Sequence, residues 1–547
     1  MKEWGSTMTN MKITTFDYSH GDYESWKLLF EYHSLYILEN GKDVYIGETK
    51  DAGTRSIKHN NVKDLCCQYS FTRIHILTGK TFDETPAKHF ETLLIRLMRA
   101  DGKFHVINTQ TEWQHYSRKN VFELCFDQVW LELEKLGLVN HKSFQSVLNL
   151  SQYKFSPNMP LTEAQCETLT SIIHTLDSEE MQPHKQGFHA RPVLISGDPG
   201  TGKTVVATSL FYYLKTHEAY KDLKIGLVYA ASATRAEIQE MFKSVRGLRK
   251  KDVITPISVT KETYDIIICD EAQRLRRPKN AGRFYNAKMY AANRQLGLDE
   301  SCDELDWLLT CSRNLILFYD EKQSVCASDI SKDSFYSRLY NRYRGIRPIV
   351  LTEQLRICAG RDYISYIYDL LYQRTSERKE FDGYEFKLFQ SFDHMVQQVR
   401  EKENMVGLCR LCGGYAWKWT AKENPDIPDI QIENTNIWWN KQTGGWLRNP
   451  RARKEMGSIY TLPGLDLNYA AVVIGPELYY DTAENRIKVS RSHLYDNSVK
   501  QNTNDEDLRK YILNTYGVFM TRGILGTYVY ACDKNLRDYL QNYIPFV

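Results

Sequence analysis

The chain has 547 residues, of which 42% are hydrophobic and 25% charged, a composition typical of globular proteins with room for about three domains. Its 71 lysines and arginines nearly balance 68 aspartates and glutamates, so the formal net charge is only +3. The net charge therefore gives no support for a nucleic-acid partner. Binding of nucleic acid would need a local basic surface.

The N-terminus and the cysteines bear on where the protein works. The first residues lack a basic stretch followed by an apolar one, and no apolar run approaches the length of a membrane span. The 12 cysteines are scattered along the chain, as is typical of reduced thiols. We therefore expect a cytoplasmic protein without a membrane partner.

After an N-terminal extension at residues 1–30, residues 31–112 predict a small α/β domain. Asn40 and Gly41 form a turn between two short apolar strands. A helical connector follows at residues 113–160. The order expected in the small domain is strand, strand, helix, strand and helix, at residues 34–38, 44–47, 48–59, 71–77 and 86–99.

The first two of these strands carry the tripeptides Ser34-Leu35-Tyr36 and Tyr45-Ile46-Gly47. They resemble the two signatures of the GIY-YIG nuclease family, with serine in place of the first glycine. In a chain with 36 tyrosines, the structural alternative is two core aromatics on a small sheet and a solvated helix glutamate. The resemblance implies a Mg²⁺-dependent nuclease domain over residues 31–112, with the candidate catalytic residues Tyr36, Tyr45, Arg55, His59, Glu91 and Asn108.

These residue types suit the hydrolysis of a phosphodiester. Arg55 and His59 lie four residues apart, so a helix places them on one face. Glu91 stands at the family's metal position, and a Mg²⁺ held there would act as a Lewis acid on the phosphate. Tyr36, with Tyr45 or His59, would position and deprotonate the water, and Arg55 would face the phosphate oxygens.

Residues 197–204 form a complete GxxxxGK[ST] phosphate-binding loop. The loop lies between an apolar run at 192–196 and a helix-forming stretch at 205–215. Its glycines allow backbone N–H groups to turn toward phosphates, Lys203 would reach the β- and γ-phosphates, and Thr204 would hold Mg²⁺. The sequence therefore predicts ATP binding through Gly197, Asp198, Pro199, Gly200, Thr201, Gly202, Lys203 and Thr204.

Strands alternate with helical patterns through the rest of the chain. This alternation predicts an α/β fold with mostly parallel sheets covered by helices. The polar residues 480–510 are expected to form an exposed loop. The expected strands are residues 224–229, 264–269, 314–319, 348–352, 405–409, 470–474 and 527–531.

The strand at 264–269 is followed at once by Asp270 and Glu271. In a phosphate-loop enzyme the first carboxylate at this strand end supports Mg²⁺, and the second can polarise the attacking water. Because the chain also carries a phosphate-binding loop, a catalytic role for the two carboxylates is favoured over a buried strand that ends in two acidic residues without a function.

Together with Gln273, these residues match the DEAQ motif of the superfamily 1 helicases, which the chain resembles over roughly residues 160–547. The resemblance implies two RecA-like parallel-sheet domains, at residues 161–350 and 351–547. The segment Met520-Thr521-Arg522-Gly523 and the residues after it are closer to a Schlafen-like group of phosphate-loop ATPases. The implied site residues are Gln165 for adenine, Gln323 as the γ-phosphate sensor, and Arg356 and Arg522 at the transferring phosphoryl group.

The fifth helicase motif departs from its family pattern. Pro463 stands where relatives carry glutamine, and proline cannot supply a glutamine side chain's hydrogen bonds. Efficient coupling of hydrolysis to strand movement is therefore not predicted. A basic cluster after the DEAQ motif can follow a nucleic-acid backbone or form a solvated face, and it comprises Arg274, Arg276, Arg277 and Lys279.

Two catalytic sets in one chain predict a Mg²⁺-dependent endonuclease coupled to a helicase-type ATPase. DNA is favoured over RNA as the substrate, an oligomer or accessory protein is compatible with the sequence, and the resemblance implies a role in anti-phage defence. Two alternatives stay open. One is an ATP-driven nucleic-acid-binding switch whose N-terminal domain only binds, and the other is a repair helicase with a non-cutting N-terminal domain.

Overall fold

The computed structural model describes most of the chain and divides it into two compact units, residues 1–154 and 155–547. Each unit is considered by itself. The described residues are 12–18, 33–49, 68–78, 84–108, 119–140, 147, 156–157, 161–178, 192–243, 245, 247–278, 282–343, 346–354, 357–421, 424, 426–441, 446–462 and 466–547.

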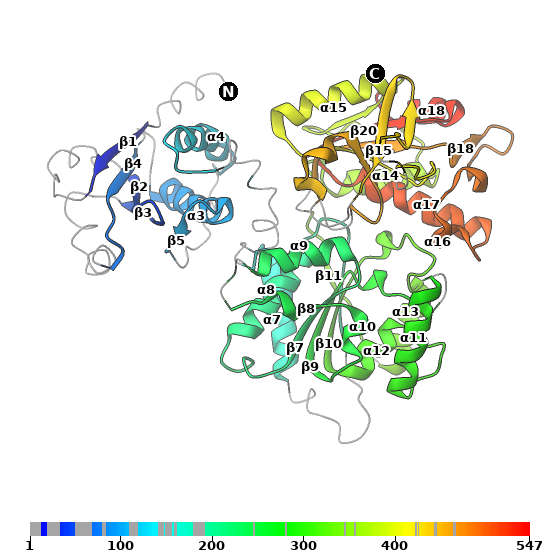
Figure 1. Ribbon diagram of the computed structural model, residues 1–547, viewed down its shortest axis with the longest axis horizontal. Coiled ribbons are helices and arrows are strands. Elements are labelled where there is room, and N and C mark those ends of the chain that lie inside the picture. Colours follow the sequence, from blue (N-terminus) through cyan, green and yellow to red (C-terminus); the bar gives the residue numbers. More distant parts are fainter. Residues whose placement is uncertain are drawn as a thin grey trace. The chain divides into compact units, whose positions relative to one another are not determined.

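The first unit is built on a five-stranded sheet with two described helices (Figure 1). The described strand pairs are antiparallel except for the last two strands, which are parallel. The helices are α3 (Glu84–Asp101) and α4 (Lys119–Lys135). The strands in spatial order are β1 (Lys12–Asp17), β4 (Arg73–Thr78), β2 (Ser34–Glu39), β3 (Asp43–Thr49) and β5 (His105–Val106).

The apolar side chains of α3 and α4 pack together beside the sheet. The rings of Phe90 and Phe126 lie 5.2 Å apart in a core that also buries Leu35 and Val44. Strand β1 falls within the stretch expected as an extension, and it pairs with β4 because its β-branched and aromatic residues suit an edge strand. The helix expected at residues 48–59 lies almost entirely outside the described residues.

The second unit contains a six-stranded sheet in which every described pair is parallel. The strand β9 alternates between two apolar cores, with Ile266 and Ile268 in one and Ile267 and Cys269 in the other. Helices therefore cover both faces of the sheet (Figure 1). The strands in spatial order are β11 (Ile349–Leu351), β6 (Pro192–Gly197), β10 (Ser312–Tyr319), β9 (Tyr264–Asp270), β7 (Ile225–Tyr229) and β8 (Val253–Ile254).

The second unit also contains a seven-stranded sheet, parallel except for its antiparallel edge pair β14 and β15. Its inner strand β17 again alternates, with Ala470 and Val472 in one core and Ala471 and Val473 in the other. The strands in spatial order are β12 (Glu385–Leu388), β20 (Gly523–Ala531), β17 (Leu467–Ile474), β13 (Cys409–Gly413), β16 (Glu455–Gly457), β15 (Thr435–Trp439) and β14 (Ile430–Ile432).

The helices of the second unit connect these parallel strands, as parallel pairing requires. Among the described residues, no helix has the length and apolar character needed to cross a membrane. The helices are α7 (Glu163–Asp177), α8 (Lys203–Thr216), α9 (Ser232–Phe242), α10 (Pro256–Val259), α11 (Arg283–Leu296), α12 (Glu304–Cys311), α13 (Lys332–Arg342), α14 (Gly360–Leu371), α15 (Phe392–Val406), α16 (Asn497–Lys500), α17 (Asp505–Met520) and α18 (Lys534–Gln541).

The two parallel sheets confirm the predicted α/β fold class, but one local expectation is wrong. Residues 480–510 do not form a single exposed loop, because they contain part of the hairpin β18 (Leu478–Asp481) and β19 (Arg486–Val489), then α16 and the start of α17. Ile487, Leu494 and Val499 are almost fully buried, so three apolar side chains anchor this polar stretch to the core.

Candidate functional site

The phosphate-binding loop connects the end of β6 to the start of α8. Gly200 and Gly202 have φ values of 87° and 80°, so the turn uses a backbone conformation that favours glycine. Gly202 is the N-cap of α8, and its carbonyl accepts the first helical bond from Val206. The loop thus presents the N-terminus of a fourteen-residue helix, which favours binding of anions such as phosphates.

Lys203 is buried, and its ammonium group faces the end of the neighbouring strand β10. Its Nζ donates to the carbonyls of Gly197 at 2.6 Å and Asp198 at 2.9 Å, and it lies 2.9 Å from Oδ2 of Asp320. Asp320 is 1% exposed and balances the lysine's charge. Asp320 is not among the residues predicted from the sequence, where the one signal for it was its position directly after an apolar run.

The two predicted carboxylates lie at the end of β9. Asp270 is fully buried; its Oδ1 accepts a bond from the backbone N–H of Glu271 at 2.9 Å, and its Oδ2 makes no hydrogen bond within the described residues. Burial and the charge of Glu271 raise the pKa of Asp270, while the Thr204 hydroxyl and Lys203 act in the opposite direction. A buried carboxylate oxygen without a partner, beside a threonine hydroxyl, fits a Mg²⁺ ion with oxygen ligands.

Glu271 occupies the left-handed backbone region, with a φ of 55°, and is 6% exposed. Its carboxylate accepts a bond from the amide of Gln273. The carbonyl oxygen of that amide accepts a bond from the backbone N–H of Asp320 at 3.0 Å. Gln273 therefore joins the ends of β9 and β10 and holds both acids in place.

A second glutamine extends this network toward the C-terminal sheet. Gln323, in the short helix η5 (Glu321–Gln323), donates from Nε2 to Oδ2 of Asp320 at 2.6 Å. Its Oε1 accepts a bond from Nη2 of Arg522 at 2.8 Å. Arg522 is 1% exposed and lies between α17 and β20. A chain of bonds thus joins Lys203 to Arg522 through Asp320 and Gln323.

Gln165 lies beneath the loop and is 2% exposed. Its Nε2 donates to the carbonyl of Thr201 at 3.2 Å, and its Oε1 accepts from the backbone N–H of Thr162 in a capping box of α7. The same glutamine predicted for adenine therefore supports the loop backbone here. Pro199 accepts a bond from Gln354 at 2.5 Å, while Arg356 and Pro463 lie outside the described residues.

Three of the candidate nuclease residues, Tyr36, Tyr45 and Glu91, lie near one another where α3 packs beside the sheet. Tyr36 and Tyr45 have ring centroids 6.1 Å apart. A Cβ added at Gly47 would collide with the Tyr36 ring, so that ring lies directly over a glycine and needs one there. Burial, Tyr45 and Glu91 raise the pKa of Tyr36 well above its usual value, which keeps it a neutral phenol.

Glu91 lies on α3 close enough to Tyr36 and Glu48 to influence and be influenced by their charges. Burial first, and then the charge of Glu48, raise the pKa of Glu91 to about 7, against a smaller opposing effect of Lys88. Two carboxylates near one another in a partly buried setting fit a divalent cation, because oxygen ligands suit Mg²⁺ and the cation would offset their repulsion.

Asn108 has a different position from the other candidates. Its Oδ1 accepts from the backbone N–H of Ile46 at 2.9 Å, and its Nδ2 donates to the Ile46 carbonyl at 2.6 Å. Both ends of the amide are thus engaged with the strand segment between Tyr45 and Gly47. Arg55 and His59 lie outside the described residues.

The family model that matches this chain falls within the second unit. The model of the Schlafen group 3 DNA/RNA helicase domain matches residues 191–533. An uncharacterized protein of Saccharomyces cerevisiae is 26% identical in an alignment of 432 residues, and the match covers 70% of this chain and 91% of that protein.

Among solved structures, the chain is similar to the Pif1 helicase from Candida albicans, at 14% identity and a TM-score of 0.22. The match covers 45% of this chain and 55% of the Pif1 chain. Bacteroides Pif1 bound to single-stranded DNA covers 68% of this chain and 92% of its own, at 11% identity and a TM-score of 0.27. The chain spans a little over half the length of the first Pif1 helicases that it matches.

Proposed function

Because the chain belongs to the Schlafen group 3 DNA/RNA helicase domain family, we propose that it is a helicase-type ATPase that acts on nucleic acid and controls an N-terminal nuclease. The proposal of ATPase activity rests on the series of hydrogen bonds that runs from Lys203 through Asp320 and Gln323 to Arg522. It brings residues from the two parallel-sheet regions of one unit to a single point beside the phosphate-binding loop.

In this account the chain's own groups divide the work of ATP hydrolysis. Lys203 and the loop N–H groups hold the β- and γ-phosphates, and Glu271 orients the attacking water. Gln323 and Arg522 stabilise negative charge on the transferring phosphoryl group. Asp270 and Thr204 would hold Mg²⁺, which supplies charge neutralisation at the phosphates.

ATP binding requires Lys203 to exchange partners. Its ammonium is shared between two loop carbonyls and Asp320, so the phosphates would replace some of these contacts. Asp320 also accepts a hydrogen bond from Gln323, and Gln323 accepts one from Arg522. A change of partner at Lys203 would therefore alter each of these hydrogen bonds. This is how nucleotide binding at the first sheet would move residues of the second.

We propose that the first unit hydrolyses phosphodiester bonds, with DNA favoured over RNA. Glu91 and Glu48 would hold Mg²⁺, which would supply Lewis acidity at the phosphate. Tyr36 would position the water as a neutral hydrogen-bond donor, since its raised pKa disfavours a role as base. Tyr45 or His59 would take the water's proton, and Arg55 would neutralise charge on the phosphate oxygens.

The nuclease is tested with purified protein, Mg²⁺ and labelled single-stranded, duplex and branched DNA, and with RNA. We expect cutting that Glu91→Gln abolishes while binding persists. If cutting is coupled to ATP, Lys203→Ala changes the rate of cutting. A rate that this variant leaves unchanged with every substrate and nucleotide would contradict the coupling but not the nuclease activity.

A nucleic-acid-binding switch is the second candidate function. It is favoured by the position of Tyr36, which is only 7% exposed and packs over Gly47 as a core aromatic can. In this case the N-terminal domain binds without cutting, and ATP turnover toggles that binding. Binding by the wild type with no cutting under any condition would support the switch.

A further inference from the structure

Two cationic side chains outside the predicted set lie beside the phosphate-binding loop. Nζ of Lys322 is 3.0 Å from Oδ1 of Asp198, and Nε of Arg361 is 3.4 Å from Oδ2 of the same carboxylate. Lys322 belongs to η5, which follows β10 of the six-stranded sheet. Arg361 lies in the first turn of α14, which packs in a core of the seven-stranded sheet. One carboxylate of the loop therefore binds a cation from each of the two parallel-sheet regions.

The chain segment before α14 also contacts the loop. Nε2 of Gln354 donates to the carbonyl of Pro199 at 2.5 Å, next to Asp198. Arg361 is thus brought to the loop by a second contact of its own segment, and not only by the reach of one long side chain. The Arg361 side chain is 58% exposed, so it can turn toward a ligand bound at the loop.

Lys322 is held more closely. The hydroxyl of Tyr368 donates to the Lys322 carbonyl at 3.1 Å, and the ring centroid of Tyr368 lies 5.6 Å from Nζ. The backbone N–H of Lys322 donates to Oδ1 of Asp320 at 3.1 Å. Lys322 also directly precedes Gln323, the residue predicted to sense the γ-phosphate. Its ammonium group therefore joins the phosphate-binding loop to the segment that carries this glutamine.

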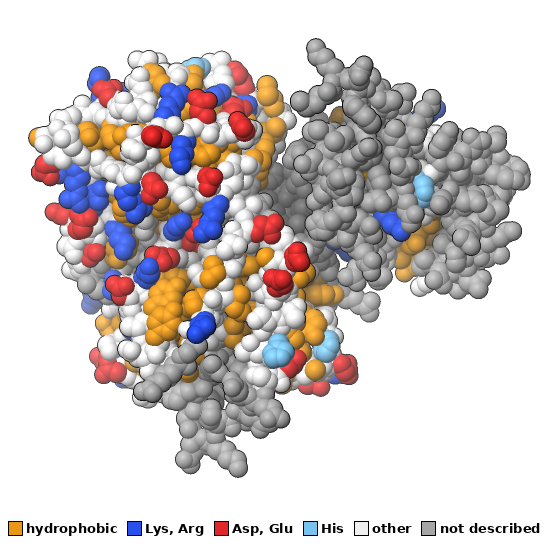
Figure 2. Space-filling model, turned by 180° about the vertical axis from the view of Figure 1, so that it is seen from behind, with side chains coloured by type: hydrophobic (Ala, Val, Ile, Leu, Met, Phe, Trp, Pro, Cys, Tyr) orange, Lys and Arg blue, Asp and Glu red, His pale blue; other side chains and the backbone are white. Residues whose placement is uncertain are grey.

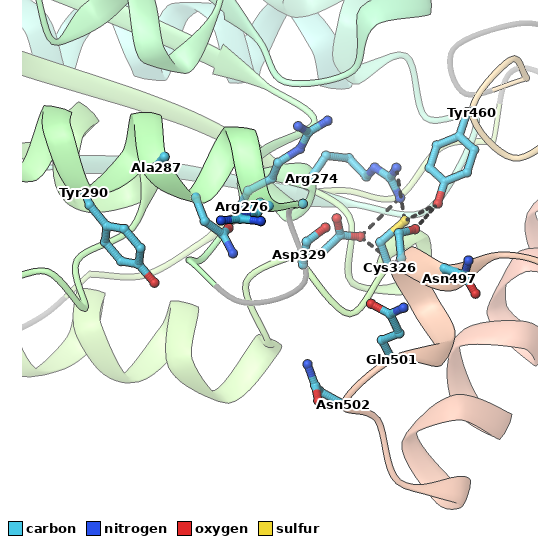
Figure 3. Close-up of a pocket in the computed structure, with 15 residues that line it drawn as sticks. Arg274, Arg276, Ala287, Tyr290, Cys326, Asp329, Tyr460, Asn497, Gln501 and Asn502 are labelled. Atoms are coloured by element: carbon cyan, nitrogen blue, oxygen red, sulfur yellow. Dashed lines mark hydrogen bonds and ion pairs between the residues drawn. The ribbon is translucent and has the colours of Figure 1, made fainter.

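The segment that follows η5 is anchored on its other side. Arg274 pairs with Asp329 at 3.1 Å, and Asp329 accepts a hydrogen bond from the backbone N–H of Cys326 at 3.0 Å. The thiol of Cys326 donates to the hydroxyl of Tyr460 at 3.7 Å, in the pocket shown in Figure 3. Because these contacts hold the backbone, a ligand at the loop changes the torsions of the Lys322 side chain and not the place of its backbone.

The local balance of charge beside the loop favours an anionic ligand. On the face seen in Figure 2, basic and acidic side chains of the described residues are interspersed, in keeping with the net charge of +3. Distant charges of both signs largely cancel and are screened by salt, so the groups next to the loop decide how strongly it attracts an anion. There, Lys322 and Arg361 carry two positive charges against the single negative charge of Asp198.

The chemistry of these three side chains fits a phosphate. Ammonium and guanidinium groups form strong charge-assisted hydrogen bonds with phosphate oxygens, and a guanidinium can present two parallel N–H donors. A carboxylate next to the same cations competes for them and repels a phosphate at short range. The backbone of Asp198 thus belongs to a loop that binds phosphates, whereas its side chain opposes them.

We propose that Lys322 and Arg361 bind the terminal phosphate of ATP, and that Asp198 weakens this binding because its carboxylate holds the same two cations and repels the phosphate. The proposal rests on the proposed function, because it adds residues to the same ATP site. The γ-phosphate is the relevant one, since Lys322 neighbours its predicted sensor. ADP has no γ-phosphate, so these three residues set the preference for ATP over ADP.

The test measures the dissociation constants of a fluorescent, non-hydrolysable ATP analogue and of the matching fluorescent ADP, with Mg²⁺ and the full chain. Lys322→Ala and Arg361→Ala each weaken binding of the ATP analogue about five- to ten-fold and that of ADP by less than about two-fold, because only the triphosphate loses a charge-assisted contact. Asp198→Asn keeps the size of the side chain and tightens binding of the ATP analogue about five-fold, because it removes the competing negative charge.

Arg374→Ala and Lys332→Ala are the matched controls. Nε of Arg374, just past the C-terminal end of α14, lies 3.1 Å from Oδ1 of Asp369, and Nζ of Lys332 lies 2.6 Å from Oε1 of Glu321. Each control removes a cation from an ion pair that does not include the loop, so both nucleotides bind as they do to the wild type. The substituted side chains are exposed or partly exposed, so the variants keep the wild-type fold, which circular dichroism checks.

The possible outcomes separate the proposal from the function on which it rests. Unchanged affinity for the ATP analogue in Lys322→Ala or in Arg361→Ala would contradict the assignment of that cation. An equal loss for ATP analogue and ADP would also contradict it, because general damage to the loop acts on both nucleotides. Unchanged or weaker binding of the ATP analogue by Asp198→Asn would overturn the opposing role of Asp198. A wild type that binds neither nucleotide would contradict the proposed function itself.

Discussion

Asp320 holds the ammonium group of Lys203 at 2.9 Å in the interior of the ATPase unit. The pair joins the phosphate-binding loop to the end of β10, and Asp320 also accepts a hydrogen bond from the side-chain amide of Gln323. Each partner in such a buried pair depends on the other, since an isolated buried charge is costly. The position of the Lys203 ammonium group therefore depends on Asp320.

Asp320→Asn tests this relationship. We expect the nucleotide-free variant to lose about 3–5 kcal/mol of stability, because Lys203 is left buried without its counter-charge. Nucleotide phosphates can restore a counter-charge, so added ATP analogue should raise the melting temperature more in the variant than in the wild type. Thermal unfolding with and without the analogue measures both effects. Equal melting temperatures of the two nucleotide-free proteins would contradict this role of Asp320.

Glu271→Gln separates binding of ATP from its hydrolysis. The side chain keeps its size, so we expect unchanged nucleotide affinity but a loss of roughly 100-fold or more in turnover, because the amide cannot act as a base toward the water. Nucleotide binding by fluorescence and phosphate release give the two readouts. Wild-type turnover in this variant would show that another group activates the water.

In the first unit, Tyr36→Phe removes one hydroxyl and retains the ring over Gly47. We expect stability within about 1 kcal/mol of the wild type, because the packing is kept. Cutting of DNA should fall about 10- to 100-fold if the phenol positions the water. Gly47→Ala is the structural counterpart, since its Cβ would collide with the Tyr36 ring and lower the melting temperature. Undiminished cutting by Tyr36→Phe would assign this tyrosine to the core alone.

Glu477 predicts a pH dependence of stability that is independent of both sites. Burial raises the pKa of this carboxyl to about 7, against the opposing hydrogen bond from Tyr516, and its Oε2 has no hydrogen-bond partner within the described residues. Since the folded pKa lies above the unfolded value, the stability that Glu477 contributes is present below about pH 4.5 and is lost as pH rises toward 7.

Glu477→Gln should therefore be more stable than the wild type at pH 8, by up to roughly 3 kcal/mol, and no more stable at pH 4. Denaturant unfolding at the two pH values measures the difference. The same difference at both pH values would show that the carboxyl does not titrate in this range.

Much of the second unit could be predicted from its sequence, because long apolar runs in alternation with helices leave little choice of fold. The strand that ends at Asp270 and the phosphate-binding loop both lie where the sequence places them. The part formed by 480–510 could not be predicted, since its few anchors, such as Ile487 and Val499, are widely spaced among polar residues. Their burial depends on contacts distant in sequence.

The candidate ATPase site, too, could be predicted from the sequence only in part. The phosphate-binding loop predicted Lys203, and the acidic pair after an apolar strand predicted Asp270. The resemblance to superfamily 1 helicases predicted Gln323 and Arg522, and hydrogen bonds through Asp320 join these two residues to Lys203. Asp320 escaped prediction because its role depends on β10 lying beside β6, which is a property of the strand order. The nuclease residues Arg55 and His59 and the role in anti-phage defence stay predictions of the sequence.

The most direct test of the central claim is the rate of ATP hydrolysis by the purified chain, with and without single-stranded DNA or RNA, in the wild type and in Lys203→Ala. The account predicts Mg²⁺-dependent turnover in the wild type, an increase when a strand is added, and no turnover by Lys203→Ala in either condition. Equal turnover by the two proteins, or a wild type that hydrolyses no ATP with any strand, would contradict it.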